Sequence, residues 1–213
     1  GGTGTGWVVS VGPSATAWDE RIRHVVFDGN YIKKGTAVGS YGFVFRGDIN
    51  GVSIRNNIVN LSLAAANGVG GEIDGDVGNS VSGNTVRDVD VVNNTIYCST
   101  GDMIRGFVFT SSPLNCRAIN NLCYAPGSTL GGVIYGTGGT GWSASNNSSV
   151  GDAQATNPSF STIPAFATNH LLTTDFKPST SRTHGAGIAD IATRDDLFHI
   201  TRTGTMDLGA VQA

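Results

Sequence analysis

The sequence predicts an all-β protein, a right-handed parallel β-helix (solenoid) of about five to six coils with an irregular C-terminal capping tail. The main observation is an asparagine that recurs with gaps of 27, 37, 27 and 26 residues. It stands at Asn30, Asn57, Asn94, Asn121 and Asn147. Periods of about 20 to 50 residues are typical of stacked units that bury their apolar faces against one another. With 31 glycines and 14% charged residues in 213, the composition also fits a loop-rich β protein.

Apolar residues bracket the asparagines at fixed offsets. Three residues earlier stand Phe27, Ile54, Val91, Ala118 and Ala144. Two residues later stand Ile32, Val59, Ile96 and Cys123. This pattern predicts short parallel strands that meet at a tight bend, where the asparagine points inward. Asparagine suits such a bend because it tolerates left-handed backbone, and its amide can bond to the next asparagine about 4.8 Å along the stack.

The gap of 37 residues indicates an insertion. Asn84 follows Asn57 by 27 residues, so we interpret the longer gap as one period plus an insertion of ten. We place this insertion at about residues 78–90 and expect it to bulge from the side, because about ten residues cannot complete a coil.

A second repeat predicts at least two matching strands in each coil. Gly42-Phe43-Val44-Phe45 returns as Gly106-Phe107-Val108-Phe109 and, more loosely, as Gly132-Val133-Ile134-Tyr135. The coils are therefore expected over residues 1–155, and residues 156–213 as a capping segment that packs on them. Because residues 7–11 already resemble a strand, we expect that the N-terminal cap was removed or that another domain or subunit supplies it.

Charge and hydropathy exclude several partners. The net charge is −3 without a basic run, so neither nucleic acid nor an anionic membrane surface is expected as a partner. No apolar run is long enough to span a membrane. The three cysteines, Cys98, Cys116 and Cys123, are interpreted as buried free thiols, with a cross-coil bridge from Cys98 left open.

Several motifs resemble the repeats of right-handed parallel β-helix proteins of the pectate-lyase-like superfamily. They are Ile54-Arg55-Asn56-Asn57-Ile58, Val92-Asn93-Asn94-Thr95-Ile96 and Ile119-Asn120-Asn121-Leu122. The tail is similar to that group's closing pattern in Asn157-Pro158-Ser159-Phe160, Phe176-Lys177-Pro178, His184-Gly185-Ala186-Gly187, Asp195 and Met206-Asp207-Leu208-Gly209-Ala210. The resemblance covers roughly residues 24–213.

The resemblance implies the fold more strongly than the activity. The superfamily contains lyases, hydrolases, epimerases, phage tailspikes and inert scaffolds. This chain departs from its catalytic members in having fewer coils. It also lacks a match to the lyase motif, with its lysine or arginine base and calcium-binding carboxylates.

One candidate site follows from aligning Arg46-Gly47-Asp48-Ile49 with Asp74-Gly75-Asp76-Val77, one coil apart. If Phe43, Phe45 and Ile73 point inward, strand alternation sends the intervening side chains outward, with Arg46 stacked against Asp74. The expected solvent-facing patch contains Arg46, Asp48, Glu72, Asp74 and Asp76, flanked by Thr110.

Three interpretations of this patch stay open. Carboxylates at alternate positions of a strand lie about 6 to 7 Å apart, within reach of the acid and base separations of glycosidases. Catalysis would then use Glu72, Asp74, Asp76 and Arg46. Asp74 and Asp76 could instead hold a calcium ion through their oxygens. The third interpretation is a solvated face with an Arg–Asp pair across the coils.

A second outward line stands three residues after the asparagines, at Lys33, Asn60, Tyr97 and Tyr124. Tyr97 and Tyr124 on successive coils could offer stacked aromatic faces for a sugar beside a lysine, with Thr110 as a further substrate contact. An ordinary aromatic stack that protects the sheet is the alternative.

These observations lead to two functional expectations. The first is an extracellular or virion-surface module that binds polysaccharide along its lateral face, with cleavage by a lyase or hydrolase mechanism left open. The second is a non-catalytic structural or assembly protein, such as part of a phage tail, a capsid decoration or an extracellular fibre. Besides polysaccharide, the expected partners are a second copy of the chain or an N-terminal capping domain or subunit.

Overall fold

The computed structural model is all β. It describes residues 7–12, 21–33, 41–61, 68–75, 84–97, 103–110, 113–124, 134–135, 140–149, 187, 195–202 and 209–210. The described residues form fifteen strands in three five-stranded sheets, and all the strand pairs are parallel. Within this part of the chain, no helix could cross a membrane.

The chain visits the three sheets in a fixed order. Sheet A contains β1 (Trp7–Val11), β4 (Tyr41–Arg46), β7 (Gly68–Asp74), β10 (Met103–Phe109) and β13 (Ile134–Tyr135). Sheet B contains β2 (Arg21–Asp28), β5 (Asp48–Arg55), β8 (Val86–Val92), β11 (Arg117–Ile119) and β14 (Ser143–Ser145). Sheet C contains β3 (Tyr31–Lys33), β6 (Ile58–Asn60), β9 (Thr95–Tyr97), β12 (Leu122–Tyr124) and β15 (Ser148–Ser149).

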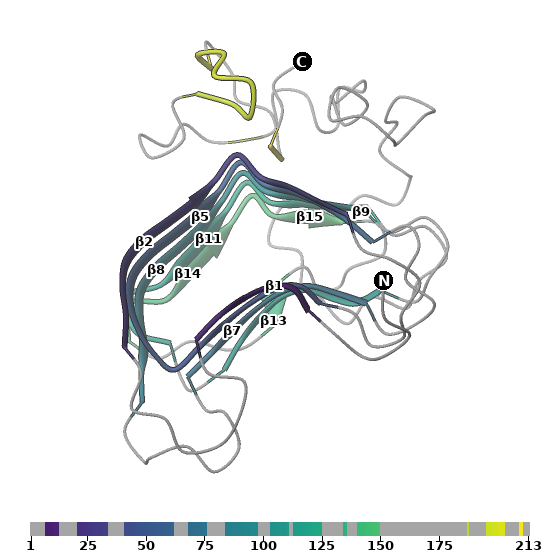
Figure 1. Cartoon of the computed structure of the whole chain (residues 1–213). Helices are drawn as coiled ribbons and strands as arrows, with labels where there is room; N and C mark the ends of the chain where they lie inside the picture. Colours follow the sequence, from purple (N-terminus) through teal and green to yellow (C-terminus); the bar gives the residue numbers. More distant parts are fainter. Residues whose placement is uncertain are drawn as a thin grey trace.

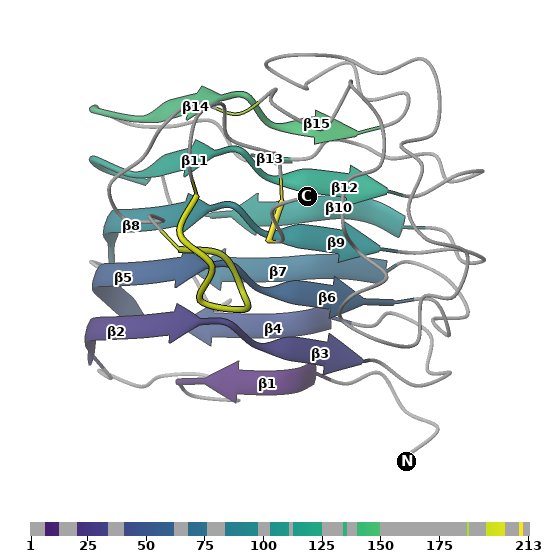
Figure 2. The same cartoon turned by 90° about the horizontal axis from the view of Figure 1, so that it is seen from above.

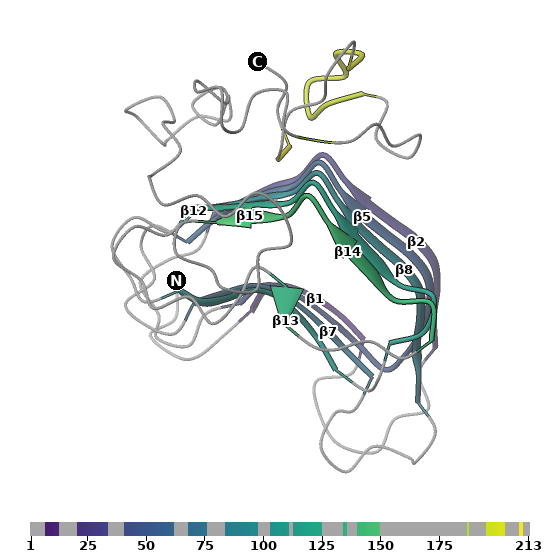
Figure 3. The same cartoon turned by 180° about the vertical axis from the view of Figure 1, so that it is seen from behind.

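Each pass through sheets A, B and C is one coil, and successive coils stack along one axis (Figure 2). Sheets B and C meet at a sharp corner, and sheet A faces them across the core (Figures 1 and 3). The predicted parallel β-helix solenoid is therefore confirmed.

At the corner between sheets B and C, one residue makes the left-handed backbone turn and the next residue points its side chain into the core. The first residue adopts the left-handed conformation, with φ between 52° and 66°, at Gly29, Asn56, Asn93, Asn120 and Asn146. The second is the recurrent asparagine, which points inward. The sequence predicted both tasks for the second asparagine, whereas the structure has the left-handed residue one position earlier.

The inward asparagines form the predicted ladder. Asn94 donates from its backbone N and its Nδ2 to Asn121 Oδ1, both at 3.0 Å. Asn57 donates in the same way to Asn94 Oδ1, at 3.0 and 2.9 Å. Asn57, Asn94 and Asn121 are fully buried, so these bonds satisfy amides that water does not reach.

The insertion lies between sheets A and B of the third coil. Arg46 pairs with Asp74, 28 residues on, whereas Ile49 pairs with Val86, 37 residues on. The difference, 37 − 28 = 9 residues, therefore falls between Asp74 and Val86. The expected range of 78–90 extends too far, because residues 86–90 belong to β8. Asn84 lies outside the ladder.

A second column of left-handed residues bends sheet B. It consists of His24, Gly51, Asp88, Asn115 and Gly141, with φ between 50° and 78°. Each stands six residues before a ladder asparagine, so the column repeats with the same gaps. This column was not predicted from the sequence, because its residues share a tolerance of positive φ and not a side-chain type.

Aromatic rings fill the core behind sheet A. Phe43 packs against Phe27 and Phe45, with ring centroids 5.5 and 5.9 Å away. The Gly-Phe-Val-Phe repeat is confirmed in register, because Phe43 and Phe107 both pair with Gly71, from opposite sides. The looser third copy is shifted by one residue, because Phe107 pairs with Ile134 and not with Val133.

The free thiols fit the expectation where the structure describes them. Cys116 and Cys123 are buried thiols that are not joined in a disulfide, and burial raises the pKa of Cys116 to about 11. Cys98 lies outside the described residues.

Part of the C-terminal region lies on the outside of the corner between sheets B and C (Figure 1). We call residues 195–202 and 209–210 the C-terminal clasp. Gly209 N donates to Asn120 O at 2.9 Å, and Ala210 N donates to Thr95 Oγ1 at 3.0 Å. The residues expected to be buried in the tail, Phe160, Phe166, Leu171, Leu172 and Phe176, lie outside the described residues.

Candidate functional site: a charged cluster on the outer face of sheet A

Strand alternation brings the predicted charged residues together. Phe45 and Ile73 are buried in the core, so their neighbours Arg46, Glu72 and Asp74 point to the outer face of sheet A. Arg46 pairs in register with Asp74, as the sequence predicted. Thr110 follows β10 on the next coil.

Arg46 and Thr110 hold the two carboxylates. Arg46 Nη2 donates to Glu72 Oε2 at 3.1 Å, and Arg46 Nε lies 3.8 Å from Asp74 Oδ2. Thr110 Oγ1 donates to Asp74 Oδ1. Side chains from three successive coils therefore meet at one place.

The cluster is more enclosed than the solvent-facing patch that we expected. The side chains of Arg46, Glu72 and Asp74 are 15%, 13% and 9% exposed. Burial raises the pKa of Glu72, and the Asp74 charge adds to this rise, although Arg46 opposes it. Glu72 therefore releases its proton at a higher pH than an ordinary glutamic acid.

Tyr41 and Arg105 also belong to this cluster, and the sequence analysis did not select them. Both pair with Val69, from β4 and from β10 respectively. Burial raises the pKa of Tyr41 the most, and the charge of Glu72 raises it further. The charges of Arg46 and Arg105 oppose this rise. The signal was present, because each of the two residues directly precedes a copy of the Gly-Phe-Val-Phe repeat. We call Tyr41, Arg46, Glu72, Asp74, Arg105 and Thr110 the sheet A cluster.

Asp48 belongs to a different face. The chain turns at Gly47, whose φ is 118°, and Asp48 begins β5 of sheet B. It binds Arg23, and it accepts from Thr85 Oγ1 at 2.9 Å. Burial alone would raise the pKa of Asp48, but the hydrogen bonds from Arg23 and Thr85 outweigh it, so the pKa is lowered. The expectation that Asp48 joins the patch was wrong.

The predicted calcium site has only one member in the described part of the chain. Asp74 already contacts Arg46 and Thr110, and Asp76 lies outside the described residues. Among the described residues, no group of three His, Cys, Asp or Glu side chains is arranged to hold a metal ion. The calcium site stays a prediction.

The second predicted line is a true column in the backbone register. Lys33 pairs with Asn60, Asn60 with Tyr97, and Tyr97 with Tyr124. Lys33 is exposed, whereas Asn60 is fully buried and Tyr97 is 4% exposed. The side chain of Tyr124 is outside the described part of the structure.

The C-terminal clasp accounts for the burial of Tyr97. Tyr97 forms an apolar cluster with Ile58 and Ala210, and Leu197 and Phe198 of the clasp pack against it. In this arrangement Tyr97 contributes to packing and offers no open face to a sugar. The sequence carried no signal for this, because the covering residues are about a hundred positions away and belong to no repeat.

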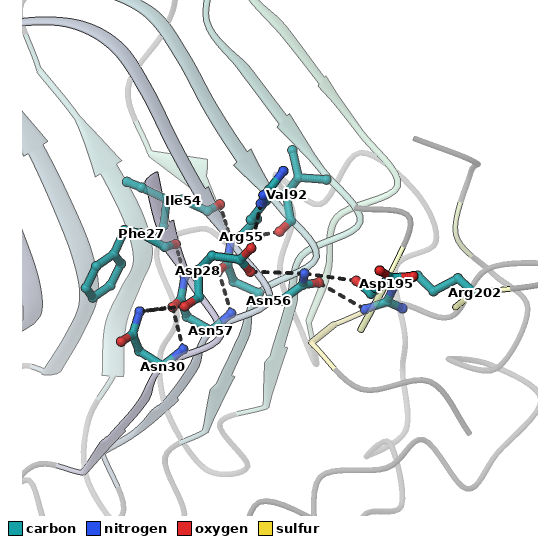
Figure 4. Close-up of polar contacts among 11 residues, drawn as sticks. Phe27, Asp28, Asn30, Ile54, Arg55, Asn56, Asn57, Val92, Asp195 and Arg202 are labelled. Carbon is teal, nitrogen blue, oxygen red and sulfur yellow. Dashed lines mark hydrogen bonds and ion pairs between the residues drawn. The ribbon is translucent and has the colours of Figure 1, made fainter. Parts of the chain in front are cut away.

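A buried arginine fixes the clasp to the corner. Arg202 Nη2 donates to Asn56 Oδ1 at 3.2 Å and to the carbonyls of Gly209 and Ala210 at 3.1 Å each. Asn56 Nδ2 in turn donates to Asp195 O at 3.0 Å and to Asp28 Oδ1 at 3.2 Å (Figure 4). Asn56, and Asn120 through its carbonyl, are thus two left-handed asparagines that bind the clasp.

The fold and the cluster define the class of protein: a parallel β-helix that carries a partly buried group of arginines and carboxylates on one lateral face. No protein-family model, curated protein or solved structure matches this chain.

Proposed function

We propose that this protein is a β-helix of the pectate-lyase-like superfamily that acts outside the cell or on a virion surface and binds polysaccharide along its lateral face. The observation that supports the proposal is the sheet A cluster. It gathers carboxylates, arginines, a hydroxyl and a tyrosine from three successive coils.

The chemistry of the cluster suits sugars. Carboxylate oxygens accept hydrogen bonds from sugar hydroxyls, and guanidinium groups donate to sugar oxygens. An aromatic ring such as that of Tyr41 can pack against the apolar face of a pyranose. Adjacent strands are about 4.8 Å apart, so the three coils span roughly 10 Å, enough for a short stretch of glycan along the solenoid axis.

If the protein cleaves its ligand, Glu72 is the candidate acid. Hydrolysis needs one carboxyl that keeps its proton and a second that is ionised, and Glu72 and Asp74 are neighbours on β7. A lyase would instead need a base beside a uronate, for which the sequence offered Lys33 or Arg46. Of these two residues, only Arg46 is on sheet A, because Lys33 belongs to β3 of sheet C.

The direct test is a screen of the wild type and Asp74→Asn against neutral and acidic polysaccharides. Affinity electrophoresis reports binding, reducing ends report hydrolysis, and ultraviolet absorbance of the unsaturated product reports elimination. We expect the wild type to be retarded by at least one polysaccharide and Asp74→Asn to be retarded less. A folded wild-type sample that gives none of the three signals would overturn the proposal.

A structural or assembly role is the second candidate, and one observation favours it. Arg46, Glu72 and Asp74 contact one another and are at most 15% exposed, as expected for a group that stabilises stacked coils. In that case the partners would be a second copy of the chain or a capping domain, and the polysaccharide screen would be negative.

A further inference from the structure

The charges on sheet A balance. Its five strands contain four charged residues: Arg46 on β4, Glu72 and Asp74 on β7, and Arg105 on β10. With both carboxyls ionised, the two positive and two negative charges give these strands a net charge of zero. The described strands of sheet A therefore carry no excess of positive charge.

The balance is also local, because opposite charges are in contact. Arg46 reaches both Glu72 and Asp74. Arg105 is close enough for its charge to act on Glu72 and on Tyr41. The phenol of Tyr41 is uncharged at neutral pH, since its ordinary pKa of 10.0 is well above neutrality, and burial raises the pKa further. The guanidinium groups thus already compensate the carboxylates beside them.

Because they are largely buried, the two carboxylates favour a neutral ligand over an anionic one. Glu72 and Asp74 are 13% and 9% exposed, so water screens their charge poorly. A ligand carboxylate or sulfate placed against them would lose its hydration and meet like charge. A sugar hydroxyl in the same place would donate a hydrogen bond to a carboxylate oxygen.

From this we infer the substrate class: the sheet A cluster binds a neutral, hydroxyl-rich glycan and discriminates against acidic polysaccharides. This inference rests on the proposed function, since it concerns the ligand of the same face. Tyr41 and Arg105 extend the binding surface on the side of Val69. Both can bind a neutral ligand, Tyr41 by ring packing and Arg105 by hydrogen bonds to sugar oxygens.

The experiment compares two probes that differ only in charge: a soluble neutral glucan, and the same glucan oxidised at C6 to a polyglucuronate. Affinity electrophoresis and calorimetry are run at low and at high NaCl. The neutral glucan should bind with little dependence on salt, because no ion pair forms with it. The oxidised glucan should bind at least about tenfold more weakly at neutral pH. Tyr41→Ala should abolish binding of the neutral glucan.

A charge substitution tests the cause. Glu72→Gln raises the net charge of sheet A by one unit, so binding of the oxidised glucan should improve by about fivefold at low salt and lose this gain at high salt. Asp90→Asn is the matched control. It adds the same charge on sheet B, where Asp90 pairs with Arg117, and should leave binding of the oxidised glucan unchanged. Circular dichroism confirms that both variants are folded.

The outcomes separate the two proposals. If the wild type prefers the oxidised glucan and Tyr41→Ala abolishes that binding, the substrate class is wrong and the proposed function stands. Equal gains in Glu72→Gln and Asp90→Asn would also overturn the inference, because overall charge would then explain them. If the neutral glucan binds Tyr41→Ala as tightly as it binds the wild type, the ligand does not bind at the sheet A cluster, and the inference is wrong. If neither glucan, nor any polysaccharide of the wider screen, binds the folded wild type, both proposals fall.

Discussion

Phe43 and Phe107 touch across a whole coil, with ring centroids 6.0 Å apart. They stand on β4 and β10, and the residue between them on β7 is Gly71. A Cβ atom at Gly71 would overlap the Phe43 ring. The missing side chain of one coil therefore makes room for the aromatic packing of its two neighbours.

Gly71→Ala should lower the free energy of unfolding by about 2 kcal/mol, because the added methyl group forces tightly packed rings apart. Urea unfolding followed by tyrosine and tryptophan fluorescence measures the change. Ser53→Ala on the half-buried outer side of β5 is the control and should stay within about 0.5 kcal/mol of wild type. A Gly71→Ala protein as stable as this control would contradict the packing described.

The asparagine ladder makes a second prediction. Asn121→Leu leaves the backbone N and Nδ2 of Asn94 without their acceptor in a buried place, so it should cost about 3 kcal/mol. Asn30→Leu is the control at the end of the ladder, where the side chain is only half-buried, and should cost clearly less. Thermal and urea unfolding of the two variants give the comparison, and equal losses would argue against a cooperative buried ladder.

A third prediction concerns the C-terminal clasp. Arg202→Met removes hydrogen bonds to Asn56, Gly209 and Ala210 and should cost about 2 kcal/mol. Hydrogen exchange of residues 195–202 should quicken, since the clasp loses its anchor.

The matched control for the clasp is Arg55→Met, which breaks the exposed pair with Asp28. Its cost should be under about 1 kcal/mol, as for other surface pairs. Slow exchange of the clasp in Arg202→Met would show that other contacts hold it.

The pH dependence of stability should separate Glu72 from Asp48. Burial raises the pKa of Glu72 above its ordinary 4.5, so folding disfavours its ionised form. The contribution of Glu72 is most favourable below that value, and it is lost as the pH rises through the raised pKa. Glu72→Gln should therefore remove a fall in stability that the wild type shows above pH 4.5.

Asp48 should show the opposite sign. Its pKa is lowered below 3.8, because hydrogen bonds from Arg23 and Thr85 outweigh the effect of burial. The stability that it contributes is present above that value and is lost as the pH falls through the lowered pKa. Urea unfolding of the wild type, Glu72→Gln and Asp48→Asn from about pH 3 to pH 7 measures both effects. Two curves parallel to that of the wild type would refute both assignments.

The sequence was sufficient to predict the ladder, because one residue type marks each rung and its apolar neighbours keep fixed offsets. Asn57, Asn94 and Asn121 are buried and bonded as expected. The same alignment also predicted correctly that Arg46 faces Asp74.

The sequence could not predict what covers the outer faces. Burial of Tyr97 depends on the clasp, which is distant in sequence and outside the repeat. The column of His24, Gly51 and Asp88 was hidden, because it is defined by backbone conformation. The enclosure of Glu72 likewise depends on tertiary packing and not on spacing.

The ladder keeps one register although the coils differ in length. Asn57 bonds to Asn94 across 37 residues with the same geometry that joins Asn94 to Asn121 across 27. The register of the corner is therefore independent of the length of the connection between sheets A and B in the same coil. We therefore expect that a foreign segment inserted between β7 and β8 leaves the positions of sheets A, B and C along the solenoid axis unchanged. The connections between strands can therefore differ in length and sequence while the coils keep their fold. Among related proteins, we expect sequence differences to concentrate in these connections and not at the corner asparagines.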